Sequence, residues 1–200
     1  MSTEGVKSKD KKLILVRGDL AEKITEMSKK EGKTIYSLTN EVLEDAIRAY
    51  MLGYKPSEMI DYFLFTVAEK EAGAVVISAD ILMHLISKIY SREKEALWKK
   101  WVEWGQWYGK YLAAKFYDQE PLETLKRMFG SGIWEVSDFN FLREANGVSM
   151  RCLMPHLSSE RTELFSKFLE GMMDSFGYCL TEHGSLRGII SLKFEKKPSA

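Results

Sequence analysis

The chain has 200 residues, of which 45% are hydrophobic, and its 29 Lys and Arg residues balance 29 Asp and Glu residues. This composition excludes an intrinsically disordered chain, and the balanced charge indicates no particular polyanionic partner. Cys152 and Cys179 are too few for a disulfide framework, and no apolar run reaches the length of a membrane span. We therefore expect a soluble, cytoplasmic protein of one or two domains that does not act at a membrane.

Residues 1–10 are predicted to be a disordered basic arm, followed by a strand at 12–17. Alternate side chains of a strand lie on opposite faces, so Lys11, Leu13, Leu15 and Arg17 share one face. The other face carries Lys12, Ile14 and Val16. Both faces therefore carry apolar side chains. Packing against a hydrophobic core would account for one of these faces, and the contact made by the other remains to be identified.

Two helices are predicted after this strand. Asp19 is the expected N-cap of the first, which runs to Glu31 and ends at Gly32. Thr34 is the expected N-cap of the second, which runs to about Leu52. One strand and two helices are too few to close a core, so a second copy is needed to pair the strands and interlock the helices.

The segment "LILVRGDLAEKITEMSKKEGKTIYSLTNEVLEDAIRAY" (13–50) resembles the ribbon-helix-helix family of DNA-binding proteins in its order and spacing. The resemblance implies a homodimer that places a two-stranded ribbon in the major groove of double-stranded operator DNA. The residues that it implies for reading bases are Lys11, Leu13, Leu15 and Arg17. It also implies that the free N–H groups after Thr34, with Lys33, hold a backbone phosphate.

Two leucines stand where family members usually have polar residues, and three interpretations are open. Leu13 and Leu15 contact thymine methyl groups between Lys11 and Arg17. Alternatively, the C-terminal domain or a partner covers them, and the unit only dimerises. In a third interpretation the strand is rotated, which turns Ile14 and Val16 outward.

The rest of the chain predicts an α+β domain over 56–197, so that the domains are an arm at 1–10, a ribbon-helix-helix unit at 11–53 and this domain. Residues 74–78 form either a short strand or the start of a helix. Asn146-Gly147 predicts one hairpin turn and His183-Gly184 a second. The predicted helices are 57–73 with an apolar face of Met59, Ile60, Phe63, Leu64 and Val67, 78 onward, 92–116, 121–130 and 159–176.

The helix at 92–116 carries four of the five tryptophans. Trp98, Trp101, Trp104 and Trp107 step by three and form a broad aromatic face, which is typical of a core helix; the candidate pocket residues on this helix are Trp98, Trp101, Trp104 and Tyr108. The same face is also a candidate pocket for an apolar or planar effector, because buried indole N–H groups need partners. Gly105 and Gly109 allow another element to approach closely in either case.

No motif for catalysis, nucleotide binding or cofactor binding is present, so we expect no enzyme and no cofactor. His84, His156, His183 and the two cysteines lack metal-ligand spacing, which predicts no metal site. Few Asn and Gln beside many Lys and Glu are typical of thermophilic proteins.

Residues 148–194 resemble, in the order of their strands and helix, the end of vinyl-reductase-type small-molecule sensor domains. A cysteine cluster of some members is missing, so no thiol or metal role transfers. The sequence as a whole predicts a transcription regulator, homodimeric or of higher order, with a sensing or oligomerising C-terminal domain. The alternative is an interaction protein whose N-terminal unit dimerises without binding DNA.

Overall fold

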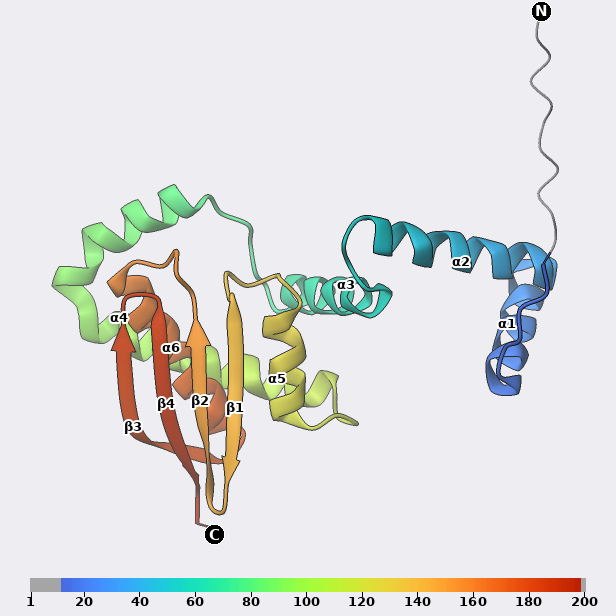
Figure 1. Ribbon diagram of the computed structural model, residues 1–200. Coiled ribbons are helices and arrows are strands. Elements are labelled where there is room, and N and C mark those ends of the chain that lie inside the picture. The colour runs from blue at the N-terminus through green and yellow to red at the C-terminus, as the bar shows by residue number, and fades with distance from the viewer. Residues whose placement is uncertain (1–11, 199–200) are drawn as a thin grey trace, which may run out of the picture. The chain divides into compact units, whose positions relative to one another are not determined.

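The computed structural model describes residues 12–198, and the chain divides into two units, Met1–Pro56 and Ser57–Ala200 (Figure 1). The predictions for the basic arm and for Lys11 lie outside the described residues. No described helix is both long and apolar enough to cross a membrane. Because the two units are separate compact bodies, each is described by itself.

The N-terminal unit contains two helices, α1 (Gly18–Glu31) and α2 (Ile35–Met51). Gly32 ends α1 with a left-handed φ of 64°, and the Thr34 hydroxyl accepts a hydrogen bond from the N–H of Ser37 at 3.1 Å, so both predicted helix signals are confirmed. The prediction of Asp19 as N-cap is wrong. Arg17 takes that position without a side-chain cap, and its guanidinium donates to Asp19 in the first turn at 3.0 Å.

Residues 12–17 belong to no strand in the single chain, so the predicted strand is absent without a partner. A strand requires a partner edge for its backbone groups, and the described part of the N-terminal unit contains only helices besides this segment. Leu38 and Ala49 are the only hydrophobic residues that this described part buries. The unit therefore leaves most of its apolar side chains exposed.

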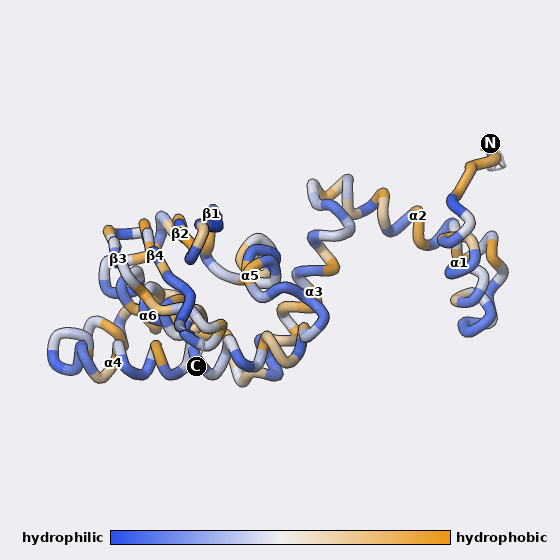
Figure 2. The backbone as a smooth tube through the Cα atoms, turned by 90° about the horizontal axis from the view of Figure 1, so that it is seen from below, coloured by the Kyte–Doolittle hydropathy of each residue, from blue (hydrophilic) through white to orange (hydrophobic). Residues whose placement is uncertain are grey.

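The C-terminal unit is built on a four-stranded antiparallel sheet in the order β1-β2-β4-β3. Its strands are β1 (Asp138–Glu144), β2 (Gly147–Leu153), β3 (Tyr178–Leu186) and β4 (Ile189–Lys196). Helix α6 (Ser159–Ser175) lies between this sheet and the second half of α4 (Ala79–Lys115), as Figures 1 and 2 show together. The unit is therefore α+β, as predicted.

The sheet has one apolar and one polar face. Val148, Met150 and Cys152 of β2 are buried toward the helices, together with Ile190, Leu192 and Phe194 of β4. These residues alternate with exposed ones such as Arg151 and Ser191, which is the pattern of a sheet covered on one side. Helix α5 (Pro121–Gly130) packs beside β1 and begins at Pro121 as predicted.

Three predictions about the helices need correction or completion. The helices expected from residue 78 and over 92–116 are one helix, α4, with a kink where Glu93 leaves helical geometry (φ −129°, ψ 32°). Residues 74–78 are the lead-in to α4 and form no strand. Helix α3 (Pro56–Glu71) buries Phe65, Ala68 and Glu69, whereas most of its predicted apolar face, including Phe63, is exposed.

The first predicted hairpin is confirmed, but it turns at Ala145-Asn146, one residue before the predicted Asn146-Gly147, and Gly147 pairs with Glu144. The second hairpin turns at Arg187-Gly188 and not at His183-Gly184. Strand β3 continues through Gly184, which pairs with Ser191. Gly188 has a φ of 72°, a conformation that favours glycine, and so it makes the turn. The sequence offers two glycines four residues apart, and the longer strand pairing selects the second.

Candidate functional site: an apolar pocket and an exposed N-terminal segment

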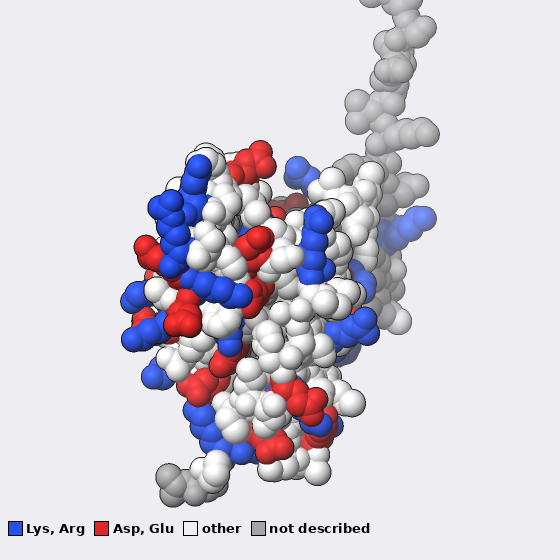
Figure 3. All heavy atoms as spheres, turned by 90° about the vertical axis from the view of Figure 1, so that its left-hand side faces the viewer, with Lys and Arg blue, Asp and Glu red and all other residues white. Residues whose placement is uncertain are grey.

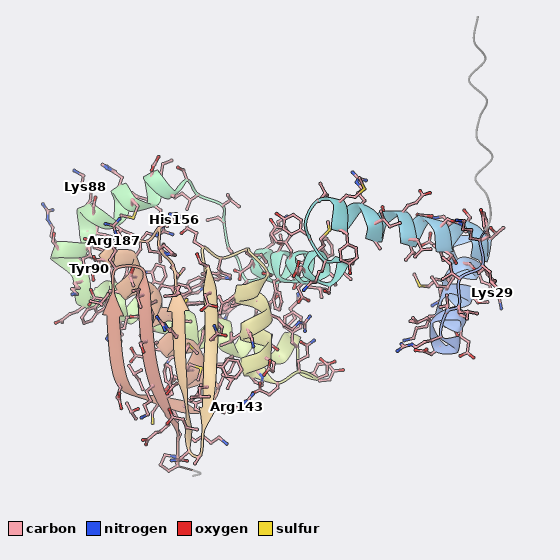
Figure 4. All side chains as sticks on the ribbon, in the orientation of Figure 1. Lys29, Lys88, Tyr90, Arg143, His156 and Arg187 are labelled. Carbon is pink, nitrogen blue, oxygen red and sulfur yellow. The ribbon has the colours of Figure 1, made fainter. Side chains whose placement is uncertain are left out.

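The C-terminal unit contains a cavity of about 560 Å³ between α3, the 74–78 segment, α4 and α6. Its size lies in the range of small-molecule sites, roughly 300–1,000 Å³. The cavity lies near the end of the sheet at which β2 and β3 finish. Met154, which directly follows β2, lines it together with Leu157. His156, in the loop after β2, and Arg187, in the turn between β3 and β4, lie at the same end of the sheet (Figure 4). Most lining residues are apolar or aromatic, and these include Tyr62, Val75, Ile77, Leu82, Trp101, Trp104, Ile133, Trp134 and Phe165.

Glu69 is the buried charged residue of this cavity. It shares the core-facing side of α3 with Phe65 and Ala68, since Phe65 lies three residues before Ala68 and four before Glu69, spacings that share one face of a helix. The Tyr108 hydroxyl and the Trp134 indole N–H both donate to its Oε1, the latter at 3.1 Å. Burial raises the pKa of the Glu69 carboxyl, and the two hydrogen bonds oppose this shift only in part.

The other polar groups of the lining differ in how they are satisfied. The Arg161 guanidinium forms an ion pair with Glu135. The Thr66 hydroxyl is buried and has no hydrogen-bond partner among the described residues. Lys70 lines the cavity with an exposed side chain. The cavity thus combines an apolar surface with one buried acid and one unpartnered hydroxyl.

Of the four aromatic residues predicted to line a pocket, only two line the cavity. Trp101 and Trp104 line the cavity. Tyr108 is fully buried behind it and acts as a donor to Glu69. Trp98 lies outside the cavity, where the ammonium groups of Lys94 and Lys167 are 4.6 Å and 5.3 Å from its ring.

Sequence reasoning missed Glu69, Thr66 and Trp134. The first had a detectable signal, because Glu69 lies one helical turn from Phe65 and next to Ala68 in the stretch "FTVAEKEA". A carboxylate within a stripe of small and apolar residues indicates a buried acid. Trp134 follows a loop and had no comparable pattern, since only the fold brings it to Trp104 at a ring distance of 6.1 Å.

The predicted DNA-binding residues lie on the N-terminal unit. Leu13 and Leu15 are 92% and 91% exposed, more than Ile14 and Val16, which favours the first pair as the outward face. Arg17 is paired with Asp19, and Lys33 is paired with Glu41 at 2.8 Å and Glu31 at 3.1 Å. The Thr34 hydroxyl already accepts the capping hydrogen bond from the N–H of Ser37. The cations near this segment are therefore partly neutralised by acids of the same unit.

The histidines and cysteines are spread over the C-terminal unit. Burial raises the pKa of the Cys152 thiol to about 12, so it is held as a neutral core residue. His183 Nε2 is 3.0 Å from the Ser166 hydroxyl. Within residues 12–198, no group of three His, Cys, Asp or Glu side chains could hold a metal ion. On the face shown in Figure 3, acidic and basic residues are interspersed.

No protein-family model and no curated protein matches the chain. Two solved structures align with part of it. One, from work on how protein-induced porphyrin distortion modulates heme redox potential, shares 14% identity over 68% of this chain and 89% of its own, with a TM-score of 0.38. The other is an H-NOX mutant with 4-cyano-L-phenylalanine at site 5, with 16% identity, 65% and 83% coverage and a TM-score of 0.37. Likeness at this level does not establish a shared fold or a heme site.

Proposed function

We propose that the chain is a homodimeric, DNA-binding transcription regulator whose C-terminal unit senses a small molecule. The observation that carries this proposal is the incomplete core of the N-terminal unit. Leu38 and Ala49 are the only hydrophobic residues that its described part buries, while apolar side chains of both helices and of the 12–17 segment stay exposed. The exposed set includes Leu13, Ile14, Leu15, Val16, Leu20, Met27, Ile35, Val42, Leu43 and Ile47.

A second copy resolves this incomplete core. Pairing of two 12–17 segments would satisfy their backbone groups, and four helices would then enclose Ile14, Val16 and the apolar side of α2. Such a ribbon, followed by two helices with a capped second helix, is the ribbon-helix-helix arrangement that the sequence resembles. Assembly above the dimer would use the C-terminal unit.

The ribbon would read a short, nearly palindromic operator through the major groove. Leu13 and Leu15 would lie on thymine methyl groups, and Lys11 and Arg17 would supply hydrogen bonds at the ribbon ends. The first N–H groups of α2 would hold a phosphate, helped by the helix dipole. Lys33 would join them only by exchanging Glu31 and Glu41 for that phosphate.

The alternative is a dimeric interaction protein that does not bind DNA. Two observations favour it. The outward positions Leu13 and Leu15 are apolar and almost fully exposed, as expected for a surface that contacts another protein. Arg17 and Lys33 are already paired with acids. DNA binding has to overcome these ion pairs, whereas protein docking does not.

The test is binding of the full chain to DNA from its own upstream region and to random duplex, across a salt series. Neutralisation of phosphates makes log K fall by about 0.9 per contact for each unit of log salt. The Leu13→Ala/Leu15→Ala variant should lose selectivity, and Arg17→Ala should weaken binding and flatten the slope. Lys88→Ala removes one exposed charge from the C-terminal unit and serves as the control.

Selective binding that Leu13→Ala/Leu15→Ala abolishes and Lys88→Ala preserves would support the regulator. A protein that is dimeric yet binds neither duplex at low salt would contradict it. The interaction protein would then be the remaining proposal.

A further inference from the structure

We infer that the cavity beside Glu69 binds an apolar amine, a small molecule with a protonated amino group on a largely aromatic or aliphatic body. The inference gives the proposed sensing role a ligand class, and its regulatory meaning rests on the proposed function. It depends on three features of the cavity: its apolar walls, its buried carboxylate and the way in which its other charges are paired.

The walls favour a flat, apolar body. Trp104 and Trp134 both stack on Phe168, at ring distances of 4.3 Å and 5.3 Å, and this fully buried residue fixes their orientation. Trp101 meets Trp104 edge-on at 5.7 Å and extends the same wall. A rigid aromatic wall loses little side-chain entropy when a ligand binds, because its rotamers are already fixed by packing. The indole faces also attract a cation.

Glu69 supplies the charge that an amine needs. Tyr108 and Trp134 both donate to Oε1, so Oε2 is the oxygen that these donors leave unused. Glu69 forms no ion pair with any described cationic side chain, although it is buried. A buried carboxylate without a positive partner is unfavourable, and an ammonium group would provide both the charge and the hydrogen bonds.

The neighbouring polar groups strengthen the preference for a cation. Thr66 lies three residues before Glu69 on α3, and its buried hydroxyl has no partner among the described residues. This hydroxyl can accept a second hydrogen bond from an ammonium group. Arg161 would otherwise attract an anion, but Glu135 neutralises it. Lys70, the other cation of the lining, has an exposed side chain that solvent and salt screen. Glu69 is the buried charge of the cavity and therefore sets the sign of the ligand.

The position of Glu69 also indicates how binding could be signalled. Thr66 and Glu69 both belong to α3, which begins at Pro56, the last residue of the N-terminal unit. An amine held by these two residues would restrain the helix that follows the N-terminal unit in the chain. Binding would then bias the operator affinity of the dimer by its preference for one α3 arrangement.

The experiment compares three probes that differ only in their end group, tryptamine, tryptophol and indole-3-acetate, by calorimetry on the full chain. Tryptamine should bind at least about tenfold more tightly than tryptophol, because a hydrogen bond to a charged group contributes more than a neutral one. Indole-3-acetate should not bind, because Glu69 repels it. Equal affinities for the three probes, or binding by none of them, would overturn the inference.

Glu69→Gln should abolish the preference for tryptamine over tryptophol. Glu71→Gln is the matched control, since Glu71 lies on the same helix but contacts Tyr111 and Lys115 outside the cavity. If Glu69→Gln does not fold, Thr66→Val tests the same site and should weaken tryptamine several-fold. An unchanged preference for tryptamine over tryptophol in a folded variant of the site would contradict the proposal.

The DNA arm of the experiment separates this inference from the proposed function. Operator titrations are repeated with saturating tryptamine. Selective tryptamine binding without any DNA binding would leave the amine site standing and remove the regulator. DNA binding without selective tryptamine binding would support the regulator and remove the amine site.

Discussion

The two units of this chain differ in how completely they satisfy their own apolar residues. In the C-terminal unit a continuous core joins the sheet, α5, α6 and the second half of α4, and its aromatic residues contact one another in a chain from Phe139 to Tyr111. In the N-terminal unit the described residues bury Leu38 and Ala49 and little else that is apolar. The C-terminal unit buries a core within one chain, whereas the N-terminal unit does so only under the proposed dimerisation.

This difference separates two kinds of information in one sequence. The apolar residues of the C-terminal unit specify its internal packing, so their effects should not depend on protein concentration. If those of the N-terminal unit specify the proposed dimer, the effects of substituting them should appear only where the partner chain is present. Substitutions in the two units can therefore be compared at different protein concentrations.

The largest effect is expected for Phe168→Ala. Phe168 is fully buried and packs against Trp104, Tyr108, Trp134 and Phe165. Truncation of a buried phenylalanine costs about 3–5 kcal/mol, because it removes apolar contacts and leaves a cavity. Denaturant unfolding followed by tryptophan fluorescence should show this loss at any protein concentration. A loss below about 1 kcal/mol would mean that the aromatic core is loosely packed.

Ile47→Ala is the corresponding test in the N-terminal unit. Ile47 is 57% exposed in the single chain, so without a partner its truncation should have little effect. Burial in a dimer raises the expected cost to about 2–5 kcal/mol. Sedimentation and circular dichroism over a dilution series should show dissociation at higher concentration than in the parent. An unchanged dissociation curve would place the dimer contact elsewhere on the unit.

Gly105→Ala tests the close contact between α4 and α6. A Cβ at position 105 would collide with the carbonyl oxygen of Phe168, and this backbone atom cannot move without shifting α6. Overpacking of this kind costs about 1–3 kcal/mol. Ala at Gly109 first meets the Ser175 hydroxyl, which can rotate, so its cost should be smaller. Thermal unfolding of both variants checks this order, and a larger loss at Gly109 would contradict it.

Local signals in the sequence were sufficient wherever a turn or cap decided the structure. Thr34, Gly32 and Pro121 act as predicted, because their effects depend on a few neighbouring residues. The first hairpin was placed to within one residue, since it turns at Ala145-Asn146. The close approach at Gly105 and Gly109 was also predicted correctly. The fold class followed from the alternation of helical and strand periodicities.

Predictions failed where packing over a distance decided the outcome. Helix α3 carries apolar residues on several sides, and only the fold selects the side with Phe65 and Ala68. The pocket combines α3 with Trp134 of a distant loop, so no single stretch predicts it. The 12–17 strand is a different case, because its pairing depends on a second chain and stays a prediction.

Glu69→Gln should give the smallest change, seen as a difference in pH dependence. Burial raises the folded-state pKa of Glu69 above its unfolded value, so the folded chain holds this proton more tightly than the unfolded chain. The stability that it contributes is therefore full below the unfolded pKa and is lost as pH rises through the folded pKa. Glutamine keeps the shape and removes this titration.

The free energy of unfolding of the parent should consequently fall relative to that of Glu69→Gln as pH rises from about 4.5. Other acids have lowered pKa values and produce the opposite trend, notably Glu71 and Asp174. The difference between parent and variant cancels their contributions. A difference that stays constant with pH would mean that Glu69 is solvated in the folded chain, and it would then lack the unmet charge that an amine ligand requires.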